Sequence, residues 1–88
     1  MKLIIAIISD EDSEPVSNAL IAADFRITRV ASTGGFLRRG STTFMIGVED
    51  DKLDEAIELV QQTCTPANEP GLRRATLFTL NVDRFLQI

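Results

Sequence analysis

Two nearly continuous apolar runs constrain the fold of this chain more than any other feature. Residues 2–8 read KLIIAII and residues 42–48 read TTFMIGV. Short runs of this kind, rich in β-branched side chains, are typical of strands that are buried on both faces. We therefore expect two such strands, and we expect the second face of each to need a cover.

Periodicity predicts two further strands and a first helix. Residues 25–31 alternate, so that successive side chains point to opposite sides of a strand, and residues 74–82 predict the fourth strand. Asp12 or Ser13 is the expected N-cap of the helix, with Pro15 in its first turn. The helix carries one apolar stripe, formed by Val16, Ala19, Leu20 and Ala23.

A second helix is predicted after Asp50, which is its expected cap. Its apolar residues recur at helical spacing and share one face: Leu53, Ala56, Ile57, Val60 and Cys64. Cys64 is most simply a small buried apolar residue on this face, and a reactive thiol is the alternative. Residues 65–71 hold two prolines and a glycine, so they predict a loop.

The predicted order of elements is βαββαβ, which is typical of the ferredoxin-like α+β fold. In this fold two helices cover one face of a four-stranded antiparallel sheet. At 88 residues the chain should form a single domain over 1–88. Because strands 2–8 and 42–48 are apolar on both faces, we expect other copies of the chain to cover the open face.

Composition excludes several classes of function. The chain has no His and a single Cys, so it offers no Ser-His-Asp or Cys-His nucleophile and no zinc set. We therefore expect no catalytic residues, no metal and no enzymatic activity. The net charge of −4 argues against binding to nucleic acid. The apolar N-terminal run is too short to span a membrane and lacks a signal-peptide cleavage site, so we expect a cytoplasmic protein.

The loop STGGFLRRGSTT at residues 32–43 is a candidate site. Gly34 and Gly35 leave backbone N–H groups unshielded, as a phosphate-binding loop requires, and Phe36 offers a surface on which a base can stack. Arg26 and Thr28 lie on one face of the preceding strand. The alternative is a hairpin whose Phe36 and Leu37 pack on a neighbouring subunit, and both interpretations hold if the ligand lies between subunits.

Three stretches of the sequence strongly resemble the PII-like cyclic-di-AMP receptor family: MKLIIAI, FRITRVASTGGFLRRGSTTFMIGVED and ATLFTLNVDRF. The resemblance covers nearly the whole chain, and the pattern STGGFLR.G.TTF..GV is specific to that family. It implies a PII-like homotrimer that binds cyclic di-AMP, or a related adenine nucleotide, in clefts between subunits. It also implies a receptor that acts on a downstream protein partner, which the sequence does not name.

The resemblance also implies the residues of the ligand site. Phe36 and Leu37 would pack against an adenine, Arg26 and the loop backbone would face phosphate or base acceptors, and Gly47 would let the ligand approach the strand. Phe78 is included, although it could also be a simple core residue. The full implied set is Asp24, Arg26, Thr28, Gly35, Phe36, Leu37, Ser41, Gly47, Phe78 and Gln87.

Three features depart from the family pattern. Asp24 and Ser41 stand where Asn is common, and a carboxylate at position 24 lacks the amide donors and would repel phosphate. The segment TPANEPGLRR is about twenty residues shorter than the loop that the resemblance implies there, and Arg73 and Arg74 are candidates to compensate for it by charge. These departures keep open a second function, that of a PII-like interaction protein that does not bind cyclic di-AMP.

Overall fold

The computed structural model describes residues 1–32, 40–65 and 74–88 and confirms the predicted order of elements. Most boundaries lie within one residue of those predicted. The elements are β1 (Lys2–Ser9), α1 (Asp10–Ala22), β2 (Arg26–Ser32), β3 (Ser41–Val48), a short 3-10 turn η1 (Asp50–Lys52), α2 (Leu53–Thr63) and β4 (Ala75–Asn81).

The four strands form one antiparallel sheet in the order β2-β3-β1-β4. The two apolar runs, β1 and β3, are its central strands. Ile5, in the middle of β1, is paired with Met45 of β3 on one side and with Phe78 of β4 on the other. This register places all three side chains on the same face of the sheet.

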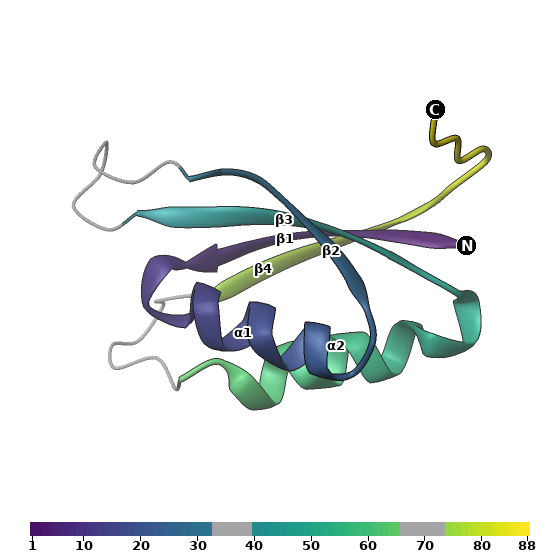
Figure 1. Ribbon diagram of the computed structural model, residues 1–88. Coiled ribbons are helices and arrows are strands. Elements are labelled where there is room, and N and C mark those ends of the chain that lie inside the picture. Colours follow the sequence, from purple (N-terminus) through teal and green to yellow (C-terminus); the bar gives the residue numbers. More distant parts are fainter. Residues whose placement is uncertain (33–39, 66–73) are drawn as a thin grey trace.

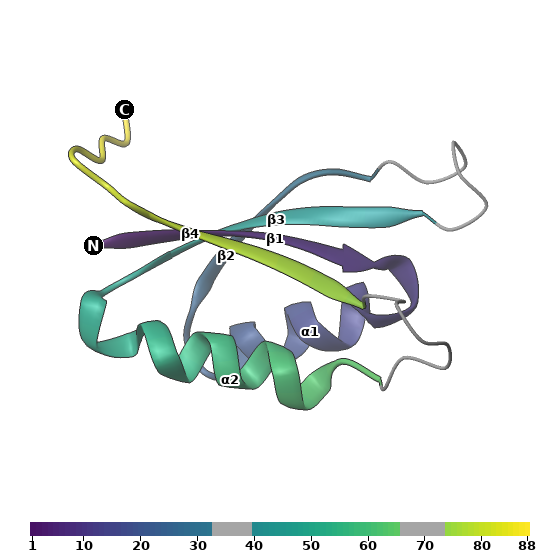
Figure 2. The ribbon, with the colours of Figure 1, turned by 180° about the vertical axis from the view of Figure 1, so that it is seen from behind.

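Both helices cover the other face of the sheet (Figures 1 and 2). The core between the layers is made by alternate residues of β1 and β3 and by the apolar stripes of the helices. Its fully buried members include Ile4, Ile8, Val16, Leu20, Phe44, Ile46, Ala56 and Val60. Leu53, Ile57 and Cys64 pack against this core, so the predicted face of α2 is confirmed. None of the helices in the described part of the chain is long and apolar enough to cross a bilayer.

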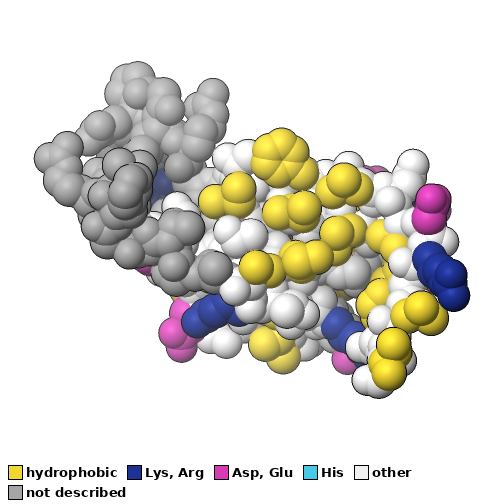
Figure 3. All heavy atoms as spheres, turned by 90° about the horizontal axis from the view of Figure 1, so that it is seen from above, with side chains coloured by type: hydrophobic (Ala, Val, Ile, Leu, Met, Phe, Trp, Pro, Cys, Tyr) yellow, Lys and Arg dark blue, Asp and Glu magenta, His cyan; other side chains and the backbone are white. Residues whose placement is uncertain are grey.

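The open face of the sheet, opposite the helices, is apolar (Figure 3). It presents the side chains that alternate with the core residues along each strand. Phe78 is 55% exposed, Leu80 46% and Met45 38%. Phe78 therefore belongs to this exposed surface, and the alternative that it is a core residue is wrong.

The first turn of α1 differs from the prediction. The helix begins at Asp10 with Ser9 as its N-cap residue, so neither Asp12 nor Ser13 is the cap, and Pro15 lies beyond the first turn. The carboxylate of Asp12 instead points to other elements. Similarly, no side chain caps α2: Asp50 lies in η1, and its carboxylate is 3.0 Å from the amino group of Met1.

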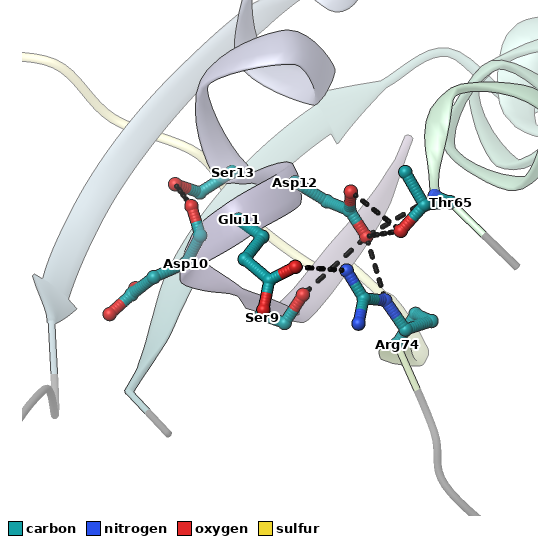
Figure 4. A network of polar contacts seen from close by, with 7 residues as sticks. All are labelled: Ser9, Asp10, Glu11, Asp12, Ser13, Thr65 and Arg74. Carbon is teal, nitrogen blue, oxygen red and sulfur yellow. Dashed lines mark hydrogen bonds and ion pairs between the residues drawn. The ribbon is translucent and has the colours of Figure 1, made fainter. Parts of the chain in front are cut away.

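Asp12 is the buried centre of a polar network that extends to the surface (Figure 4). Its carboxylate accepts hydrogen bonds from Nε of Arg74 at 3.1 Å and from the backbone N–H and hydroxyl of Thr65 at 3.2 to 3.3 Å. Arg74 also donates to Glu11 at 3.2 Å. Only 1% of Asp12 is exposed. The network thus connects the start of α1 with the end of α2 and the start of β4.

The ionisation of Asp12 follows from these contacts. Burial alone would raise the pKa of its carboxyl, but the hydrogen bonds from Arg74 and Thr65 and the positive charge of Arg74 outweigh burial. The pKa is therefore held below the ordinary value of 3.8. Asp12 is a carboxylate at neutral pH, and the folded state stabilises the charged form.

We expect the pairing of Asp12 with Arg74 to make the free energy of unfolding depend on pH in the acidic range. Because the pKa is lower in the folded than in the unfolded chain, the contribution of Asp12 is complete above pH 3.8 and is lost as the pH falls through the folded value. Urea unfolding of the wild type and of Asp12→Asn should show a difference in stability at neutral pH that narrows as the pH is lowered below 3.8. A difference that is independent of pH would contradict this assignment.

Candidate ligand-binding site

Two adjoining cavities lie at the end of the sheet where β2 begins and β3 ends. The larger, of about 760 Å³, lies between β2, β3 and the C-terminal segment. The smaller, of about 480 Å³, lies between the end of α1 and the start of α2. Both are lined by Met1, Phe25, Arg26 and Gly47, so these residues form their common wall.

Arg26 and Thr28, which the sequence suggests as ligand-binding residues, line the larger cavity. They occupy alternate positions on β2, and the register pairs Arg26 with Gly47 and Thr28 with Met45 on the open face. Both side chains are exposed. Arg26 forms no ion pair with the carboxylates of residues 1–32, 40–65 and 74–88. Its guanidinium is therefore available to an anion in the cavity.

Gly47 is the position of a close approach, as a glycine within a strand suggests. A Cβ atom added to Gly47 would lie 3.0 Å from Cε of Met1. Within the chain, the side chain of Met1 thus occupies the space beside Gly47. Because methionine is flexible, this contact can give way to a ligand without displacing the backbone.

The C-terminal segment forms another wall of the larger cavity. The N–H of Val82 donates to the carbonyl of Met1 at 3.2 Å, which continues the pairing of β4 with β1 by one residue. Beyond this bond, the segment brings Gln87 to the cavity, together with Arg84 and Phe85. Gln87 was expected there. Sequence reasoning missed Arg84 and Phe85, because residues 83–88 have no periodic pattern; their nearness to Gln87 is the only signal.

Asp24 has a structural role that the sequence did not reveal. Its φ of 72° lies in the left-handed region, just after α1. The N–H of Asp24 donates to the carbonyl of Ile21, and that of Phe25 to the carbonyl of Leu20, each at 2.9 Å. These are the two bonds of a Schellman motif, whose left-handed position favours Gly or Asn. An Asn or Asp at position 24 is therefore explained by the turn as well as by a ligand.

Asp24 also lines the smaller cavity. Two further carboxylates, Glu49 and Glu55, line it, and Lys52 lies 3.7 Å from Glu55. This cavity is thus more acidic than its neighbour. No group of three or more potential metal ligands within bonding range occurs among the described residues.

The remaining predicted site residues lie elsewhere. Ser41 is paired with Ser9 at the opposite end of the sheet, where β2 ends and β3 begins. Phe78 lies on the open face of β4, opposite Ile5. Neither lines the two cavities. Three predicted residues fall outside the described part of the chain: Gly35, Phe36 and Leu37.

Arg29 and Arg74, the described arginines that do not line the larger cavity, have partners within the chain. The guanidinium of Arg29 lies 5.5 Å from the ring centre of Phe44, on the helix side of the sheet. Arg74 is held by Asp12 and Glu11, so the suggestion that it replaces the missing loop by charge is not supported. Arg73, the other residue of that suggestion, is not among the described residues.

Comparison with known proteins agrees with this fold and with the sequence resemblance. The chain matches the family model for the cyclic-di-AMP receptor over residues 1–87, and it therefore belongs to that family. It is also similar to the crystal structure of a functionally unknown protein from Pediococcus pentosaceus. The two share 35% sequence identity with a TM-score of 0.78, over 99% of this chain and 96% of that one.

Proposed function

We propose that this protein is a cytoplasmic signal receptor that binds cyclic di-AMP in clefts between the subunits of a homotrimer. The observation that supports the proposal is that the described residues implied by the resemblance are divided between two ends of the sheet. Arg26, Gly47 and Gln87 gather at one end. Ser41, the first residue of β3, lies at the other end, roughly 20 Å away along the strand.

A single chain cannot bring these two groups of residues to one small ligand. Two copies can, if the end of one sheet with Arg26 lies beside the opposite end of its neighbour. The apolar open face supports such an assembly, since exposed patches of this kind usually mark an interface. The trimer would then place Phe36 and Leu37 of one copy over the Arg26 cavity of the next.

The chemistry of the larger cavity suits a nucleotide. Arg26 offers paired donors for a phosphate, and the hydroxyl of Thr28 and the amide of Gln87 can donate or accept to fix a base. The site would bind its ligand without transforming it, and the signal would pass to a protein partner. A second candidate is an interaction protein that does not bind this ligand. It is favoured by the carboxylates of Asp24, Glu49 and Glu55, which line the smaller cavity together with Arg26, because negative charge near Arg26 weakens phosphate binding.

Calorimetric titration with cyclic di-AMP distinguishes the two candidates. The wild type should bind, and Arg26→Gln should bind about 10- to 100-fold more weakly, because a hydrogen-bonded charge is removed. Arg29→Gln is the matched control: it changes the net charge equally on the opposite face of the same strand. If a folded wild type gives no heat of binding, the receptor function is rejected. If Arg26→Gln binds as tightly as the wild type, the proposed site is rejected.

A further inference from the structure

We propose that Arg84 and Phe85, in the C-terminal segment, are ligand-binding residues: Arg84 binds a second phosphate and Phe85 stacks on a purine. The proposal rests on the proposed function, since it concerns the same cavity. It follows from three observations, namely where these side chains lie, which partners Arg84 has, and how exposed Phe85 is.

The first observation is the placement of the segment. Arg84, Phe85 and Gln87 all line the cavity that Arg26 and Thr28 line from β2. The hydrogen bond from Val82 to Met1 fixes the point at which the chain leaves the sheet. The segment therefore starts from the end of β4, which is the edge strand opposite β2, and reaches the cavity from that side.

The second observation concerns charge. Arg84, like Arg26, makes no ion pair with the carboxylates in the described part of the chain. In a protein of net charge −4, two arginines without an acidic partner thus line one cavity from two different elements. Guanidinium groups arranged in this way suit two phosphate groups of one ligand.

The third observation is the exposure of Phe85. Its side chain is 57% exposed although it is large and aromatic, and it lines the cavity beside Arg84. The next residue, Leu86, is 64% exposed but does not line the cavity. An exposed aromatic ring that lines the same cavity as two arginines suits the stacking of a nucleobase.

Together these residues match a cyclic dinucleotide better than a mononucleotide. A cyclic dinucleotide carries two phosphodiesters, each with one negative charge, and two bases. Arg26 would bind one phosphodiester and Arg84 the other, with Phe85 against one purine. The loss of Arg84 should consequently weaken binding of cyclic di-AMP more than binding of AMP.

The test compares Arg84→Gln and Arg84→Lys with wild type by calorimetry, with Arg29→Gln as the control. Arg84→Gln should bind cyclic di-AMP about 10- to 100-fold more weakly, Arg84→Lys should recover part of the loss, and Arg29→Gln should stay within about twofold of wild type. Phe85→Leu should weaken binding about 5- to 100-fold, since it removes a stacked ring. Light scattering of each variant verifies that its assembly is that of the wild type.

Failure of this proposal can be told apart from failure of the proposed function. If the wild type binds cyclic di-AMP and Arg84→Gln binds it equally well, Arg84 is not a ligand residue, although the receptor function stands. If the wild type does not bind, the receptor function fails, and inorganic pyrophosphate then tests the two arginines. When pyrophosphate is added, the NMR amide chemical shifts of Thr28 and Gly47 should change in the wild type but not in Arg84→Gln, which would support the phosphate site. No change in the wild type would overturn it.

Discussion

Replacing Asp12 with alanine should lower the free energy of unfolding by about 3 kcal/mol. The carboxylate is buried and is bonded to both Thr65 and Arg74, so its removal leaves the Thr65 hydroxyl and Nε of Arg74 without their partner inside the protein. A small domain has a total stability of only about 5–15 kcal/mol, so the effect should be large. Urea unfolding followed by circular dichroism measures it.

Glu11→Ala is the matched control. Glu11 lies beside Asp12 in the same turn of α1 and also binds Arg74, but its side chain is 73% exposed. Since exposed ion pairs contribute little, the control should lose at most about 0.5–1 kcal/mol. Equal losses in the two variants would show that the network stabilises the fold no more than a surface pair does.

Replacing Ile5 with glutamate should convert the proposed trimer into monomers. Ile5 lies between Met45 and Phe78 at the middle of the open face, so three copies of the new carboxylate would be brought into an apolar interface. Burying a charge without a partner costs several kcal/mol, which exceeds what a modest interface supplies. Light scattering should give the mass of three chains for wild type and of one chain for the variant.

Gln61→Glu controls for the added charge, because Gln61 lies exposed on α2, on the far side of the molecule from the open face. This variant should keep the wild-type mass. The circular dichroism of Ile5→Glu should remain that of a folded chain, since Ile5 does not belong to the buried core. A wild type that is already monomeric, or an Ile5→Glu variant that stays assembled, would remove the sheet face from consideration as the interface.

The fold could be predicted from the sequence because each helix and strand is indicated by a local pattern of apolar residues. The continuous apolar runs of β1 and β3 mark the central strands, and the helical spacing from Leu53 to Cys64 marks the buried face of α2. The start of α1 could not be placed, because Asp12 is a good N-cap residue by type. Its actual partner, Arg74, lies 62 residues away, and no local pattern relates the two.

The candidate site was predictable only in part. The alternation along β2 places Arg26 and Thr28 on one face, and the resemblance adds Gln87. Arg84 and Phe85 could not be found, because what brings them to the cavity is the path of an irregular segment rather than any spacing. Asp24 shows the converse: a residue read as part of the ligand site also serves a left-handed turn.

The Asp12 network has a consequence for insertions and deletions in this chain. Thr65 and Arg74 stand at the two ends of the connection between α2 and β4, and one carboxylate binds both. The anchor points are thus fixed by α1, whatever number of residues joins them, and closing a longer loop adds little entropic cost. In this chain the connection can consequently be lengthened or shortened while the sheet keeps the same two anchor points.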